Sequence, residues 1–141
     1  MRFKDTLGIS HKLKIVEHEL CRKIEVELAK LGLTLPQYTV LSCLEEKSTA
    51  TNAELARKSS VTPQTMNKIM QNLERDGFVT KEKNSEHGLK QDFTMKPEAK
   101  KILCDAHALV NNIELKMVHG ISEVKIKEFE DILSQCLYNL Y

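Results

Sequence analysis

The sequence of 141 residues lacks the features that mark several large classes of protein. Its 21 Lys and Arg are balanced by 20 Asp and Glu, so a net charge of +1 gives the whole chain no general attraction to polyanions. Five glycines and three prolines are too few for a collagen-like or a Gly/Pro-rich disordered chain. Apolar runs of only two or three residues fall far short of the roughly 20 that a membrane-spanning helix needs. We therefore expect one soluble domain.

The N-terminus lacks the pattern of a secretory signal, and the cysteines lack the spacing of metal-binding or redox motifs. Mixed charge follows the first residues where a secretory signal would have an apolar core, so we expect a cytoplasmic protein without membrane association. The four cysteines lie far apart, without the two-residue spacing of zinc ribbons and redox motifs. A chain of this size needs no disulfide staples, and buried free thiols are expected.

The apolar spacing predicts a mainly α chain with a small β-hairpin. Thr34 with Gln37 and Thr51 with Glu54 form capping-box patterns, and Thr62 before Pro63 marks a third helix start. The polar string 48–52 is interpreted as a turn. The expected helices lie near 13–31, 35–46, 54–58, 63–75, 97–117 and 123–140, and the expected strands at 78–83 and 91–95.

Residues 51–95 have the order of a winged helix-turn-helix. Two short helices are joined by the tight polar turn 59–61, and a hairpin follows directly. In such a unit the second helix enters the major groove of DNA. Its apolar stripe, Met66, Ile69, Met70 and Leu73, is expected to face the core.

Between Gln64 and Asn72 that helix carries an unusual polar face with a single charge, Lys68. Amides can pair with adenine in two places, and a lysine can reach guanine acceptors or a phosphate. An ordinary solvated helix is the alternative, but such a helix normally carries several Glu and Lys. The expected DNA-binding residues of this helix and its cap are Thr62, Gln64, Thr65, Asn67, Lys68, Gln71 and Asn72.

Three segments, 33–41, 52–57 and 73–79, resemble the MarR family of bacterial winged-helix transcription regulators. The resemblance implies a homodimer that binds a pseudo-palindromic site in double-stranded DNA. It implies that residues 1–32 and 97–141 form a helical dimerisation region, and residues 33–96 the DNA-binding region. A repressor released by a small-molecule effector is the expected function; a winged-helix module for protein interaction, with weakened DNA binding, is the alternative.

The chain departs from the family pattern at the wing. The family's Asp-x-Arg pair, whose arginine enters the minor groove, is matched here by His87 and Leu89. Contacts of the wing with DNA then fall to Lys83, His87 or Lys90. Lys96 replaces the family's threonine before the next helix, which removes a hydroxyl cap.

The family also implies a sensor. A small aromatic effector is expected in a cleft lined by His18 and Tyr38, although Tyr38 is equally suited to the core. The pairs His18 with Cys21 and Cys104 with His107 each place two metal-binding side chains on one helical face. Burial of the cysteines as small apolar residues is the favoured interpretation, and no metal is expected.

An enzyme is not expected, because the sequence has no recognisable catalytic triad, carboxylate pair or glycine-rich phosphate loop, and no cofactor is expected either. The charge is nevertheless unevenly distributed. Residues 52–90 hold seven basic and five acidic side chains, whereas residues 97–141 hold five basic and seven acidic ones. This polarity is modest, so discrimination between DNA sequences is expected to depend on the polar face 64–72.

Overall fold

The computed structural model describes residues 8–83 and 91–141. The helices are α1 (Ile9–Ala29), α2 (Leu35–Lys47), α3 (Asn52–Lys58), α4 (Pro63–Arg75), α5 (Pro97–Met117) and α6 (Glu123–Leu140). The strands are β1 (Thr49–Thr51), β2 (Val79–Lys83) and β3 (Gln91–Met95). The expected fold class, mainly α with a small wing, is confirmed. The first helix begins at Ile9, four residues before the apolar spacing indicated.

The helix ends form where the capping patterns predict them. Thr34 and Thr51 each accept a hydrogen bond from the backbone N–H three residues on, and Gln37 and Glu54 return the second bond of the capping box. Thr62 caps α4 through the N–H of Thr65. Lys96 precedes α5 without a side-chain cap, as the sequence indicated.

Helices α1 and α4 are each followed by a glycine in the left-handed conformation. Gly32 has φ +74°, and the N–H of Leu33 beyond it bonds to the carbonyl of Leu28 at 3.1 Å. Gly77 has φ +79°, and Phe78 bonds to Leu73 in the same way at 2.9 Å. This geometry satisfies carbonyls at the helix end and turns the chain sharply.

The sheet has one more strand than the sequence predicted. The order is β1-β3-β2, all antiparallel, with Ala50 opposite Phe93 and Lys81 opposite Phe93 on its other side. The interpretation of 48–52 as a turn was therefore wrong for 49–51. A three-residue strand has almost no local pattern, and its partner lies more than 40 residues away in the chain.

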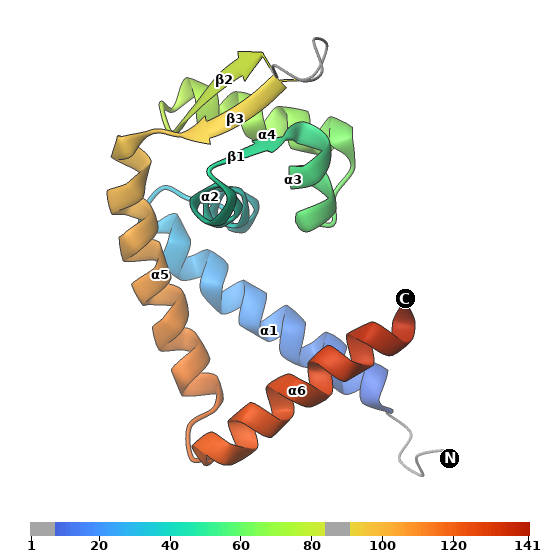
Figure 1. The fold of residues 1–141 in the computed structure, drawn as a ribbon. Coiled ribbons are helices and arrows are strands. Elements are labelled where there is room, and N and C mark those ends of the chain that lie inside the picture. The colour runs from blue at the N-terminus through green and yellow to red at the C-terminus, as the bar shows by residue number, and fades with distance from the viewer. Residues whose placement is uncertain (1–7, 84–90) are drawn as a thin grey trace.

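The core lies inside the winged unit and extends along α1 and α5. Figure 1 shows the sheet and α4 at one end, α2 beneath them, and α1 and α5 extending away from the region of α2 and diverging toward their far ends. Met66, Met70 and Leu73 of α4 are buried as predicted, while Ile69 is half-buried. The buried apolar set also includes Leu28, Leu41, Leu44, Leu55, Val79, Phe93, Leu103 and Ala106.

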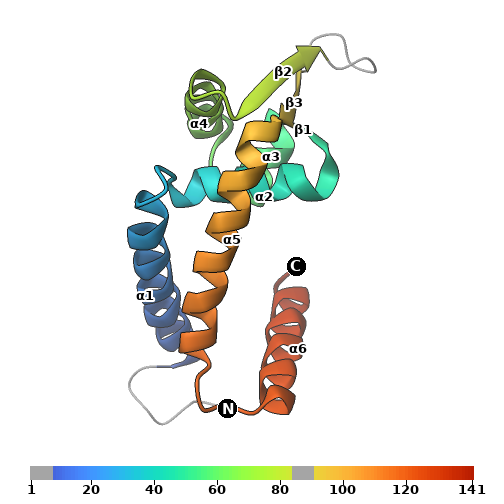
Figure 2. The ribbon, with the colours of Figure 1, turned by 90° about the vertical axis from the view of Figure 1, so that its left-hand side faces the viewer.

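Helix α6 stands apart from the rest of the chain. It buries none of its residues, and Figures 1 and 2 show it separated from the winged unit and joined to α5 only by a short turn. Most helical stability in proteins comes from packing of an apolar face, and the apolar side chains of α6, such as Phe129 and Leu137, are exposed in this structure. None of the described helices is long and apolar enough to cross a membrane.

Candidate DNA interface and effector cleft

Helix α4 presents the predicted polar face to solvent. Its buried stripe fixes its rotation, because Met66, Met70 and Leu73 must point into the core. The side chains of Gln64, Thr65, Asn67, Lys68 and Gln71 are exposed, and Asn72 is half-buried. The side chains needed for pairing with base edges are therefore free of the core.

The turn before α4 sets how that face is held. Ser60 has φ +52°, and the N–H of Val61 bonds to the carbonyl of Ala56 at 3.1 Å, which closes α3 and redirects the chain. Thr62 is exposed and is fixed by two contacts with Thr65, one to its N–H at 3.1 Å and one to its hydroxyl at 3.0 Å. Because Thr62 is exposed, the predicted contact of its side chain with DNA does not disturb the packing of the core.

The wing is only partly described. Lys83 ends β2 and is exposed, on the same side of the strand as Lys81 in the alternation of side chains. The predicted contacts of His87 and Lys90, and the departure at Leu89, lie outside the described residues. The described part of the wing thus offers two exposed lysines on β2, the strand that follows α4.

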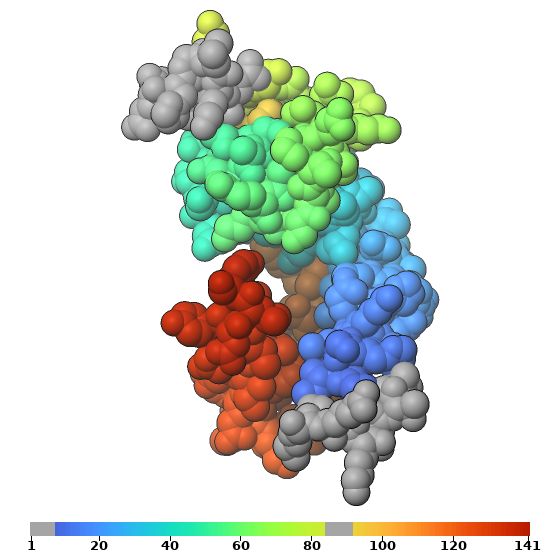
Figure 3. Space-filling view, turned by 90° about the vertical axis from the view of Figure 1, so that its right-hand side faces the viewer, coloured from blue at the N-terminus to red at the C-terminus, as the bar shows by residue number. Residues whose placement is uncertain are grey.

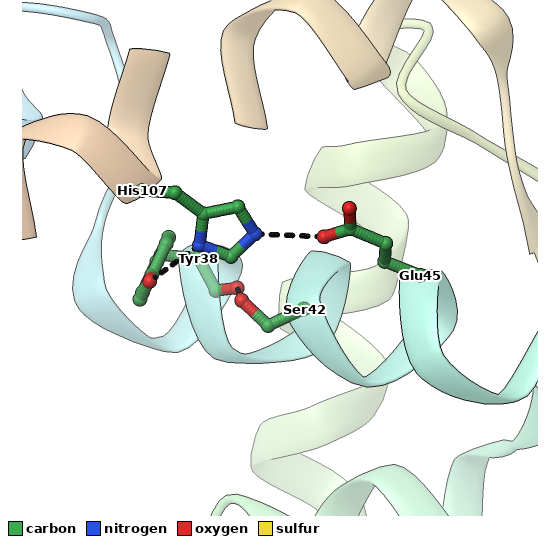
Figure 4. Close-up of polar contacts among 4 residues, drawn as sticks. All are labelled: Tyr38, Ser42, Glu45 and His107. Carbon is green, nitrogen blue, oxygen red and sulfur yellow. Dashed lines mark hydrogen bonds and ion pairs between the residues drawn. The ribbon is translucent and has the colours of Figure 1, made fainter. Parts of the chain in front are cut away.

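A polar cluster joins α2 to α5. The hydroxyl oxygen of Tyr38 lies 2.8 Å from Nδ1 of His107, and Nε2 of His107 lies 2.7 Å from Oε2 of Glu45 (Figure 4). The two rings meet edge to face with centroids 5.4 Å apart. Burial raises the pKa of the Tyr38 hydroxyl, which keeps it protonated and able to donate.

The structure does not join the two residues predicted to line the effector cleft. His18 is exposed on α1 and, within the described part of the chain, has no hydrogen bond to Tyr38. Tyr38 meets His107 instead. No local signal paired His107 with Tyr38 or Glu45, because the chain separates His107 from Tyr38 by 69 residues and from Glu45 by 62.

The metal-site candidates also lie apart from any complete ligand set. Cys21 donates to Glu17 at 3.3 Å, Cys104 is exposed, and both ring nitrogens of His107 already have partners. Among residues 8–83 and 91–141, no three His, Cys, Asp or Glu side chains are grouped so as to hold a metal ion.

A groove of about 750 Å³ is lined by residues of α1 and α5. In a separate part of the surface, Figure 3 shows a gap between α6 and the winged unit, with α5 visible behind it. The lining of the groove includes both apolar and charged side chains. The charged ones include Arg22, Lys23 and Lys116. The apolar ones include Ile15, Val16, Leu20, Leu109, Ile113 and Met117.

A capped second helix with a free polar face, a tight turn before it and a three-stranded wing behind it define a winged helix-turn-helix protein. The sequence model of the MarR family matches residues 33–87, which include α2, β1, α3, α4 and β2 but not β3. The transcriptional repressor Rv2887 of Mycobacterium tuberculosis is 28% identical over 135 residues, which cover 96% of this chain and 97% of the relative. The helix-turn-helix of this chain therefore matches the MarR family.

Solved structures agree in fold. Rv2887 in complex with salicylic acid superposes with a TM-score of 0.75 at 28% identity, covering 95% of this chain and 99% of the other. A mutant of MarR from E. coli bound to operator DNA gives 0.82 at 18% identity, covering 92% and 93%. The S. aureus MepR–DNA complex gives 0.84 at 18% identity, covering 98% and 100%. The last two likenesses concern the fold alone.

Proposed function

We propose that this MarR-family regulator is a homodimeric repressor that binds a pseudo-palindromic operator through α4 and leaves it when a small aromatic effector binds. The observation that carries the proposal is the exposed face of α4, polar and almost uncharged, beside a helix-turn-helix turn and a wing. Amide side chains lose little hydration energy when they exchange water for base edges. The naming of Rv2887 as a repressor supports the direction of regulation.

The dimer part of the proposal assigns residues 1–32 and 97–141 to dimerisation and 33–96 to DNA binding. Its support is the amount of apolar surface that the single chain leaves in water. On α6, Leu137 is 56% exposed and Phe129 is 44% exposed, and on α1 Val16 is 49% exposed. Exposed apolar patches of this extent are typical of subunit interfaces. A second copy supplies the cover that α6 and the α1–α5 groove lack.

The effector part of the proposal centres on Tyr38. Its hydroxyl donates at the junction of the winged unit with α5, where a bound molecule contacts both regions. Salicylic acid bound to Rv2887 supports an aromatic acid as the ligand class. His18 stays a predicted lining residue from α1. An effector lowers DNA affinity only by the difference between its affinities for the two dimer shapes.

The test is a gel-shift or fluorescence-anisotropy titration with the DNA that flanks the gene, at two salt concentrations. The proposal expects a saturable complex that competitor DNA of unrelated sequence does not displace, and that Gln64→Ala weakens. Equal affinity for all sequences, or none, contradicts it and favours the alternative of a winged-helix protein-interaction module.

A further inference from the structure

Tyr38 and Glu45 lie seven residues apart on α2 and hold the same imidazole of α5 from its two sides (Figure 4). Seven residues of helix rise about 10 Å, close to two full turns, so both side chains start from one face of α2. One contact would leave α2 free to slide or turn over α5. Two contacts that converge on one rigid ring restrict both motions.

The two hydrogen bonds that link Tyr38, His107 and Glu45 have one consistent assignment of donors and acceptors. A carboxylate only accepts, so Nε2 of His107 carries a hydrogen and donates it to Glu45. In the neutral ring Nδ1 is then an acceptor, and the Tyr38 hydroxyl donates to it. Every polar atom of the ring is satisfied without a water molecule.

The apolar packing between α2 and α5 fixes their relative orientation less specifically than these hydrogen bonds do. Leu103 and Ala106, which precede His107 on α5, are buried, and α5 packs against α2. Packing of small and branched side chains holds two helices together but tolerates changes of their crossing angle. The hydrogen-bonded chain adds the directional restraint that packing lacks.

We propose that Tyr38, His107 and Glu45 form an interhelical latch that fixes the angle between α2 and α5, and thereby the spacing of the two recognition helices in the dimer. The inference rests on the proposed function. α2 is the first helix of the winged unit and packs against α3, α4 and the sheet, while α5 continues into α6. The three are positioning residues, which act on DNA through α4.

The latch also gives the effector a point of action. An anionic ligand that accepts a hydrogen bond from the Tyr38 hydroxyl replaces Nδ1 of His107 as its acceptor and opens one half of the latch. The α2–α5 angle is then released, and the operator-spaced dimer loses population.

Substitution of His107 tests the latch. His107→Ala removes both contacts and is expected to weaken operator binding about three- to tenfold, the range of a lost hydrogen bond or two, with unrelated DNA bound as before. His107→Gln has one acceptor and one donor on its amide and is expected to recover most of the affinity. Tyr38→Phe is expected to have no further effect in the His107→Ala background. Glu45→Gln replaces the carboxylate at one end of the latch, and the same substitution at its exposed neighbour, Glu46→Gln, is the control.

A measurement without DNA separates this inference from the proposed function. Spin labels at Lys68→Cys, in a dimer whose four native cysteines are replaced, report the distance between the two α4 helices. A narrow distribution that broadens with His107→Ala and narrows again with His107→Gln supports the latch even if no operator is bound. Unchanged distributions, or operator affinity unchanged by His107→Ala in a protein that binds its operator, overturn it.

Discussion

The side-chain amide of Asn52, in the first turn of α3, donates a hydrogen bond to the carbonyl oxygen of Pro63, in the first turn of α4, at 3.2 Å. The bond joins the two helices of the DNA-binding unit at their N-terminal ends. The other amide atom, Oδ1, is buried without a partner in the described structure. The residue is therefore better suited to positioning α4 than to stabilising the fold.

Asn52→Ala is expected to weaken specific DNA binding while changing the free energy of unfolding by less than about 1 kcal/mol, because one neutral hydrogen bond is lost and one unpaired buried atom is removed. Asn52→Asp sets a carboxylate against the Pro63 carbonyl and is expected to be worse. Anisotropy titrations and urea unfolding measure the two effects, with Asn111→Ala as control. A large stability loss in Asn52→Ala would show that the bond supports the fold instead.

Lys68 is the single charge on the polar face of α4. If it contacts a phosphate, Lys68→Ala weakens binding to all sequences and lowers the slope of log K against log salt by about 1 for each subunit of the dimer. If it reads a guanine, the loss is confined to the operator, at about 1–3 kcal/mol. Titrations of operator and unrelated DNA at several salt concentrations distinguish the two. We expect the second result, since Gln64 and Asn67 beside it are uncharged.

The apolar face of α6 predicts a dimer that a single charge disrupts. Leu137→Asp is expected to give a monomer in analytical ultracentrifugation, because the carboxylate would be buried without a partner at the interface. Lys127→Ala, on the polar face of α6, removes only an exposed ion pair with Asp131 and is expected to leave the dimer intact. A Leu137→Asp dimer of unchanged affinity contradicts the interface.

The capping box of α3 predicts a pH dependence of stability. The backbone N–H of Thr51, which donates to the carboxylate at 3.0 Å, lowers the pKa of Glu54. Because the pKa of Glu54 is lower in the folded state, its contribution to the free energy of unfolding is complete above the pKa of the unfolded chain, about 4.3. That contribution is lost as the pH falls through the pKa of the folded state.

Glu54→Gln keeps an acceptor for the Thr51 N–H but does not titrate. The difference in unfolding free energy between the native protein and Glu54→Gln is therefore expected to shrink as the pH falls from about 6 to 3. Thr51→Ala removes the other half of the box and is expected to lose about 1 kcal/mol at all pH values. Denaturant unfolding across this range checks both. A constant difference for Glu54→Gln contradicts the assignment.

Burial predicts that Cys43 is a slow nucleophile. Desolvation raises the pKa of the Cys43 thiol, and the thiolate is the reactive form. We expect iodoacetamide at pH 8 to modify Cys43 at least about tenfold more slowly in the folded protein than in guanidinium, measured by mass spectrometry of the peptides. Equal rates would show that α2 opens readily.

The sequence by itself determined which segments are helical, and it determined those helix ends that carry a capping residue or a glycine. Capping residues and glycines act on their own first or last turn, so Thr34, Thr51 and Gly77 carry their signal locally. The rotation of α4 was also predictable, because Met66, Met70 and Leu73 recur with the period of a helix whose one face is buried.

The tertiary structure alone decided which distant residues meet. Strand β1 exists because the edge of β3 offers unpaired backbone groups opposite Ala50, and three residues without a partner show no strand pattern. His107 reaches Tyr38 and Glu45 because α5 packs across α2, a contact that the sequence could not predict. Local signals come from a residue's neighbours in the chain, whereas these contacts depend on how whole helices pack.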